Sequence, residues 1–173
     1  MKNSKLILFF LSIILLSSCL KEKETNYSSL DPIDWKKRST SKKLDSSLTY
    51  GETYLSVHSE IYMYSKSRTN TLTAAISMRN INQSDSIYIK SARYFNTKGE
   101  LIRSYFKDPI YIAPLETVDI VIDEDDLEGG TGANFIFEWY SSPEIHVPYF
   151  DAVMVSYGSG QGVSFTSSGI RIK

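Results

Sequence analysis

Apolar residues recur at every second position along most of the chain from Thr53 onward. In "TLTAAISMRN" the apolar side chains fall on one face and the polar side chains on the other; the apolar set is Leu72, Ala74, Ile76 and Met78. A spacing of two is typical of a β-strand, whose successive side chains point to opposite faces of a sheet, whereas a helix repeats every 3.6 residues. The pattern therefore predicts strands that each bury one face.

Turn residues separate these alternating segments into short strands. Two further apolar sets alternate in the same way, Val118, Ile120 and Ile122 and then Phe135, Phe137 and Trp139. The stretch "NTKG" suits a type I turn that ends in a left-handed glycine, and "PIYIAP", bracketed by prolines, suits an edge or sheet-switching segment. We expect an all-β fold, an antiparallel β-sandwich of immunoglobulin type with about seven to nine strands and with Trp139 buried between the sheets.

Residues 1–18 have the features of a lipoprotein signal peptide. A basic start precedes the apolar run Leu6–Leu16, which is shorter than the roughly 20 residues needed to span a bilayer. The run ends in "LSSC", which resembles the lipobox of bacterial lipoproteins, and Cys19 is the only cysteine of the chain. The resemblance implies cleavage between Ser18 and Cys19 and acylation of Cys19 with fatty acids such as palmitate. The alternative is an ordinary signal peptide that ends in an unrelated cysteine.

Acylation of Cys19 would anchor the chain in the bacterial cell envelope, because two or more acyl chains hold a protein stably in a membrane. Leu20, rather than an acidic residue, follows the cysteine, so we expect the outer membrane rather than the inner membrane. "KEKE" faintly resembles tracts that direct some lipoproteins to the cell surface, but it equally suits the start of a solvated tether. The side of the membrane therefore stays open.

Residues 19–51 are polar, rich in serine and without a hydrophobic pattern, which predicts a flexible tether before a domain at residues 52–173. The middle of this tether is basic, with Trp35 beside Lys36, Lys37, Arg38, Lys42 and Lys43. Two interpretations stay open. Trp35 and the cations could rest on an anionic membrane surface, or the charges could be solvated while Trp35 docks on the domain.

The charge balance and the cysteine count exclude several classes of function. From Gly51 to Lys173 the chain has ten lysines and arginines against fifteen aspartates and glutamates, a net charge of −5. A nucleic-acid partner would require a basic domain, so we expect none. A single cysteine cannot form a disulfide framework, and its use at the lipid anchor excludes a blue-copper site. We expect no cofactor.

No catalytic motif is recognisable in the sequence. A serine nucleophile needs a base, and the two histidines, His58 and His146, lack the surroundings of a known triad. His146 lies in an apolar loop between prolines, where a structural histidine is the usual outcome. We therefore expect a protein that is not an enzyme, with an envelope hydrolase as the third hypothesis.

An acidic run offers an alternative function as a metal-binding domain. Its candidate ligands are Asp123, Asp125, Asp126 and Glu128, beside a glycine-rich loop. Calcium is bound by such oxygen-rich loops, although the EF-hand pattern is not met. A solvated loop between strands is the plainer interpretation.

The glycine-rich loop has the residues of a conspicuous motif, Gly129, Gly130, Gly132 and Asn134. A phosphate-binding loop needs a helix behind it to supply amide donors and a positive dipole end. Here the following residues have strand spacing, so we expect the glycines to supply positive φ angles in a tight connection between strands. The role of this loop stays open.

Tyrosines are numerous enough to suggest a sugar-binding face, and cross-strand packing within the sheets is the alternative interpretation. The tyrosines considered are Tyr54, Tyr62, Tyr64, Tyr88, Tyr94 and Tyr105.

Several segments together resemble a bacterial family catalogued as domain of unknown function 3124. These segments are "SEIYMYSKSRTNTLTAAISMRNIN", "RYFNTKGELIRSYFKDPIYIAPLETVDIVI", "GGTGANFIFEWY" and "GQGVSFTSSGI". The resemblance covers nearly everything from Tyr54 to Ile172, and it implies a small secreted or lipid-anchored protein without supplying a reaction or a ligand. We expect a non-catalytic binding or accessory module that meets the membrane through its lipid and binds an envelope protein or glycan.

Overall fold

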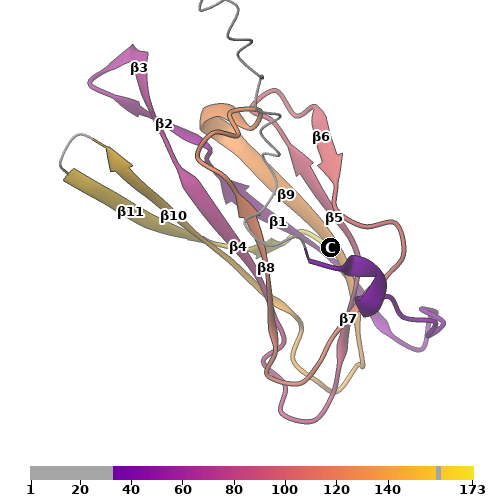
Figure 1. Cartoon of the computed structure of the whole chain (residues 1–173). Helices are drawn as coiled ribbons and strands as arrows, with labels where there is room; N and C mark the ends of the chain where they lie inside the picture. The colour runs from indigo at the N-terminus through magenta and orange to yellow at the C-terminus, as the bar shows by residue number, and fades with distance from the viewer. Residues whose placement is uncertain (1–32, 159–160) are drawn as a thin grey trace, which may run out of the picture.

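The computed structural model describes residues 33–158 and 161–173 (Figure 1). The predicted signal peptide and Cys19 lie outside these residues. Within them the chain forms β-strands and two short 3-10 helices, η1 (Trp35–Arg38) and η2 (Gly130–Gly132). None of the helices in the described ranges is long and apolar enough to cross a membrane. The prediction of an all-β fold is confirmed.

Two antiparallel sheets face each other across the core, and a separate hairpin extends from them (Figure 1). The first sheet has the order β12 (Ile170–Arg171), β1 (Thr49–Val57), β9 (Ala133–Ser141), β5 (Ile87–Phe95) and β6 (Leu101–Ser104), with β7 (Ile110–Ile112) also paired to β5. The second sheet has the order β11 (Gln161–Ser168), β10 (Tyr149–Gly158), β4 (Thr73–Arg79) and β8 (Thr117–Ile122). The hairpin consists of β2 (Glu60–Met63) and β3 (Ser65–Thr71).

The alternating apolar residues fill the space between the sheets, as the sequence predicts. The buried members include Leu72, Ala74, Ile76, Met78, Val118, Ile120, Ile122, Phe135 and Phe137. Trp139 is fully buried among them, and its Nε1 donates a 2.9 Å hydrogen bond to Thr53 Oγ1. The guanidinium of Arg171 lies 4.9 Å from the centre of the indole. Gly51 stands opposite Trp139 in the β1–β9 register and leaves room for the ring.

The described residues form twelve strands, more than the seven to nine expected, because β2 and β3 form an additional hairpin and the last predicted strand is divided into β11 and β12. The hairpin β2–β3 leaves both sheets. The edge beside β5 is shared by β6 and β7, with the irregular stretch 105–109 between them. The last segment changes sheet at Gly169, whose N–H donates to Phe150 O at 2.8 Å, so β11 completes one sheet and β12 the other.

The structure differs from the expected tether over residues 33–48, which we call the strap. Trp35 packs on Phe106 with ring centroids 5.1 Å apart, Ser39 forms a bridge with Ile110, and Thr40 N donates to Pro109 O at 2.9 Å. The strap thus covers the β7 edge, where unpaired backbone groups and an apolar surface favour a partner. The interpretation in which Trp35 docks on the domain agrees with this geometry, and the first strand starts at Thr49 rather than at residue 52.

Candidate functional site

One end of the sandwich, which we call the hairpin end, brings two hairpins together. The hairpins β2–β3 and β10–β11 both extend beyond the sheets at the upper left of Figure 1. Asn70 of β3 donates a 2.7 Å hydrogen bond from Nδ2 to Ser156 Oγ of β10, so the base of the β2–β3 hairpin is joined to β10 close to the β10–β11 turn. Tyr62 Oη accepts a 3.3 Å hydrogen bond from Thr131 of the glycine-rich loop.

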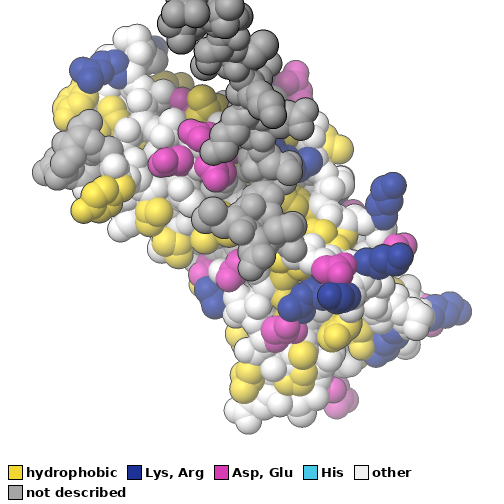
Figure 2. Space-filling view, in the orientation of Figure 1, with side chains coloured by type: hydrophobic (Ala, Val, Ile, Leu, Met, Phe, Trp, Pro, Cys, Tyr) yellow, Lys and Arg dark blue, Asp and Glu magenta, His cyan; other side chains and the backbone are white. Residues whose placement is uncertain are grey.

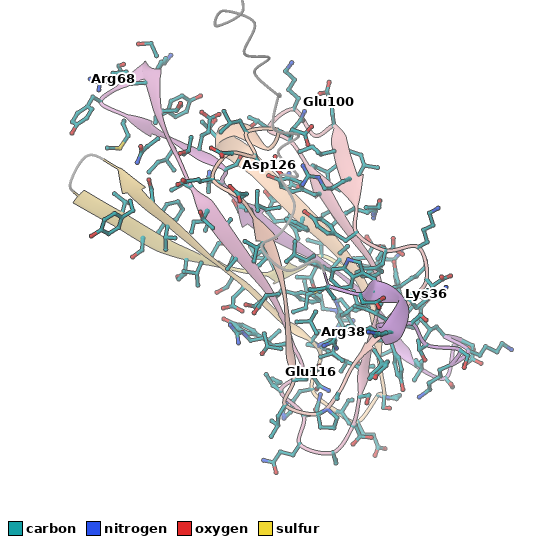
Figure 3. The ribbon with its side chains drawn as sticks, viewed as in Figure 1. Lys36, Arg38, Arg68, Glu100, Glu116 and Asp126 are labelled. Carbon is teal, nitrogen blue, oxygen red and sulfur yellow. The ribbon has the colours of Figure 1, made fainter. Side chains whose placement is uncertain are left out.

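Three tyrosines of the hairpin end are directed to solvent. Tyr62 is 61% exposed, Tyr64 89% and Tyr157 95%. Tyr64 has a φ of +63°, a left-handed conformation that a bulky residue rarely adopts. The guanidinium of Arg68, labelled in Figure 3, lies 5.6 Å from the Tyr64 ring centre. An aromatic side chain is therefore displayed at the turn where glycine or asparagine would be relaxed.

The six tyrosines of the predicted sugar-binding face do not share one surface. Tyr62 and Tyr64 are exposed, whereas Tyr94 is fully buried and stacks on Phe135 with ring centroids 4.8 Å apart. Tyr157 is not among the tyrosines predicted for a binding face, although its position in β10 alternates with the buried Met154 and Ser156 and so indicates the outer face. The packing interpretation holds for Tyr94 and not for Tyr62 or Tyr64, whose side chains project into solvent.

The glycine-rich loop is fastened by its own carbonyl groups. Gly129 O accepts hydrogen bonds from Thr97 N and Oγ1, both at 3.0 Å, and Gly130 O accepts from Ser59 N at 3.1 Å. The expected positive φ is found at Gly130, which has +70°, and not at Gly129 or Gly132. Gly129 is required for another reason, since a Cβ there would lie 1.9 Å from the hydroxyl oxygen of Tyr94.

No helix suited to a phosphate group follows this loop. The three residues of η2 lead directly into β9, where Asn134 is paired in register with Ser56 of β1. Gly132 N donates to Thr97 Oγ1 at 2.9 Å, so this amide is already used. The structure thus agrees with a connection between strands.

The acidic run is divided between two places. Asp126 has a side chain with no exposed surface, and its Oδ2 lies 2.7 Å from the guanidinium of Arg103, which also contacts Glu128 Oε2 at 2.5 Å. Asp123 Oδ1 instead accepts the backbone N–H of Asp125 at 3.1 Å. In the part of the chain that the structure describes, no three His, Cys, Asp or Glu side chains are grouped as a metal site. The candidate ligands therefore form an ion pair with arginine and a turn rather than a coordination sphere.

Two tyrosines with buried hydroxyl groups, Tyr94 and Tyr105, lie beside this ion pair. Burial raises the pKa of Tyr94 to about 12 and raises the pKa of Tyr105 further above its usual range. Both hydroxyl groups are buried, and neither has a hydrogen-bond partner among the described residues. The guanidinium of Arg103 also lies over the Tyr94 ring, 5.7 Å from its centre. This arrangement supports a structural role that fastens the loop between β8 and β9 to β6.

The two histidines are held in separate places. His58 Nδ1 lies 2.6 Å from Thr131 O, and its ring meets the edge of Phe165 with centroids 5.8 Å apart. His146 has an exposed side chain, while its backbone N–H and carbonyl are hydrogen-bonded to the side chain of Asn82. The prediction of a hydrogen-bonded structural residue thus applies to the backbone of His146 and not to its ring.

A family model described as "Protein of unknown function (DUF3124)" matches residues 50–172. No curated protein and no solved structure matches the chain.

Proposed function

The chain belongs to the DUF3124 family, and we propose that it is a lipid-anchored, non-catalytic binding module of the bacterial cell envelope. Its hairpin end would bind another envelope protein. The observation that supports this most directly is Tyr64, an exposed aromatic residue held in a left-handed backbone conformation.

Packing within the domain does not explain a tyrosine that is both strained and exposed. A backbone in such a region costs on the order of 1–3 kcal/mol, and strain of this kind is concentrated at functional sites. Tyr64 is 89% exposed, so its ring gains little from packing within the domain. A partner that buries the ring would recover that cost on binding.

The surroundings of Tyr64 favour a protein partner over a glycan. Tyrosines supply large, rigid contact areas, and neighbouring serine, asparagine and glycine side chains supply adaptable hydrogen bonds; antibody combining sites use the same mixture. The hairpin β2–β3 and its turn read "EIYMYSKSRTNT", which combines two exposed tyrosines with hydroxyl, amide and basic side chains. Lys66 and Arg68 are exposed there and would suit acidic groups on the partner.

Anchoring and the absence of catalysis are supported by separate observations. The lipobox at Cys19 supports export and acylation. His58 is engaged by Thr131, and the Asp126 carboxylate is paired with Arg103, so these groups have structural partners in place of catalytic ones. No contact among the described residues specifically favours an envelope hydrolase or a metal-binding domain.

Photo-crosslinking in intact cells tests the binding surface. A photoreactive amino acid is placed in the full-length chain at Tyr64 or Tyr157. As a control it is placed at Tyr111, an exposed tyrosine of β7, the strand that lies away from the hairpin end in Figure 1. We expect one discrete protein adduct from the hairpin positions and none from Tyr111.

The identified partner is then purified and its affinity is measured for wild type and for single alanine variants. Tyr64→Ala should weaken binding at least roughly tenfold, the effect of a central aromatic contact, and Tyr111→Ala should leave the Kd unchanged. Equal adducts at all three positions, or an unchanged Kd for Tyr64→Ala, would refute the proposed surface. Binding of purified envelope glycans that Tyr64→Ala abolishes would replace the protein partner by a glycan.

A further inference from the structure

We propose that the lysines of the strap form a surface that binds anionic phospholipid headgroups and holds the domain against its own membrane. We call Lys36, Lys37, Lys42 and Lys43 the basic surface. The inference rests on the proposed acylation of Cys19, and it adds an orientation for the domain to the proposed function.

The basic surface stands apart in charge from the rest of the domain. Residues 33–48 carry five cations against Asp34 and Asp45, a net charge of +3, whereas residues 51–173 carry −5. Lys37 is 83% exposed and Lys43 88%. Their acidic neighbours lie 3.5 and 3.9 Å away, and such solvated pairs bind weakly, so the two lysines remain available to a stronger anionic surface. Figure 2 shows several Lys and Arg side chains, with acidic ones among them, on the side of the molecule where η1 lies in Figure 1.

The strap presents these cations from a fixed position. Arg38 forms a 2.8 Å ion pair with Glu116, and Lys42 Nζ lies 3.1 Å from Tyr88 Oη and 4.6 Å from the centre of that ring. Trp35 is engaged with Phe106. Because the indole is already docked on the domain, contact with a membrane would be electrostatic and would not require insertion of Trp35.

The position of the anchor brings this surface to the membrane. Only 14 residues, 20–33, separate Cys19 from Asp34. A chain of that length spans at most about 50 Å when fully extended, so the anchor keeps the lysines close enough to the bilayer to come within the Debye length of about 8 Å. Each lysine near an anionic leaflet strengthens binding roughly fivefold.

The orientation that results agrees with the location of the hairpin end. Lys36 and Arg68 lie on opposite sides of the molecule in Figure 3. Contact of the basic surface with lipid would therefore leave Tyr64 and Tyr157 directed away from the bilayer, where a partner can reach them.

Lysine footprinting on the acylated full-length product tests the inference. The chain is reconstituted in vesicles of neutral phosphatidylcholine or in vesicles that contain phosphatidylglycerol, and a water-soluble reagent acetylates accessible lysines. We expect Lys36 and Lys43 to react at least about fivefold more slowly in the anionic vesicles, and Lys66 and Lys98 to react equally in both. High salt should remove the protection.

Two charge-matched variants and a flotation step separate the possible failures. The double variants Lys36→Gln/Lys43→Gln and Lys66→Gln/Lys98→Gln each lose two positive charges. Protection of Lys37 and Lys42 should fall in the first variant and persist in the second. A chain that floats with the vesicles in high salt but shows equal lysine rates in both lipids overturns this inference and leaves the lipid anchor intact. A chain that does not float overturns both. Protection that is equally strong in neutral vesicles also overturns the inference, because lipid charge would then have no part in it.

Discussion

Replacement of Gly51 by alanine tests how the core is packed around Trp139. A Cβ at Gly51 would lie 2.2 Å from Cζ2 of the indole and 2.6 Å from both Cε2 and Cη2. Carbon atoms pack no closer than about 3.5 Å, so the ring must move by more than about 1 Å. Trp139 is fully buried, bonded to Thr53 and covered by Arg171, and cannot shift without disturbing both contacts.

The expected loss of stability follows from these contacts. Overpacking of a core costs about 1–3 kcal/mol, and a disrupted buried hydrogen bond adds about 1 kcal/mol. We expect Gly51→Ala to lower the free energy of unfolding by about 3 kcal/mol, a large fraction of the roughly 5–15 kcal/mol of a typical domain. Urea unfolding monitored by circular dichroism measures the difference.

Gly162→Ala supplies the matched control. Gly162 also lies in a strand, but a Cβ there would meet Tyr157 at 3.7 Å, an ordinary contact. The free energy of unfolding of Gly162→Ala should be unchanged or higher by a few tenths of a kcal/mol, about what removal of a strand glycine contributes. In a Trp139→Phe background, Gly51→Ala should cost at least about 1 kcal/mol less than in wild type, because the smaller ring leaves room. The packing argument is refuted if Gly51→Ala matches Gly162→Ala in wild type.

Four further outcomes are expected. Asp126→Asn should lower the free energy of unfolding in urea by about 2–3 kcal/mol, because it removes the buried carboxylate that pairs with Arg103 and leaves that arginine only the exposed Glu128. Asp125→Asn, at an exposed site, should change the free energy of unfolding by less than about 0.5 kcal/mol, and equal effects would contradict the ion-pair assignment. Tyr94→Phe should raise the free energy of unfolding at neutral pH by about 1 kcal/mol, because it removes a hydroxyl that is buried without a partner in the described chain. The pKa of Tyr94 is about 12 in the fold against 10.0 for an ordinary tyrosine, so the unfolded chain loses this proton first as the pH rises. The wild-type protein therefore loses stability between these pH values. Urea midpoints across that range should decline less steeply for Tyr94→Phe than for wild type. Trp35→Ala should release the strap, lowering the free energy of unfolding by about 1–2 kcal/mol and speeding hydrogen exchange of the strap amides. Unchanged exchange would contradict the docking of the strap on the domain. Chelator or added calcium should leave the Tm unchanged in a thermal scan, and a shift of several degrees would restore the metal hypothesis.

The core was predictable from sequence where alternation runs without interruption. Leu72 to Met78 and Val118 to Ile122 alternate within single strands, and every predicted apolar residue of these sets is buried. A period of two is set by the backbone alone, so it needs no knowledge of the neighbouring strand.

In strand β5, alternation alone predicts the wrong face for part of the strand. Ile87 and Ile89 face the core, and uninterrupted alternation would direct Tyr94 outward. The register of β5 against β9 shifts between Ile89 and Ser91, which reverses the faces so that Ala92 and Tyr94 are buried. A bulge depends on pairing with another strand, and nothing in "IYIKSARYF" marks it.

The loop contacts depended on tertiary proximity and could not be predicted from spacing. Asp126 looked like one member of an acidic run, but the fold places it against Arg103 of β6, and this pairing separates it from Asp123. Trp35 lay in a segment whose composition predicts a tether, and it docks because Phe106 presents an apolar surface beside an open edge. Both cases depend on a partner distant in sequence.

The change of sheet at Gly169 has a consequence for biosynthesis. The final residues place β11 on the edge of one sheet and β12 beside β1, the first strand of the other sheet. A chain that is still being synthesised lacks an edge strand in both layers until β11 and β12 have emerged. We expect the domain to reach its folded state only after β11 and β12 have emerged and paired with β10 and β1.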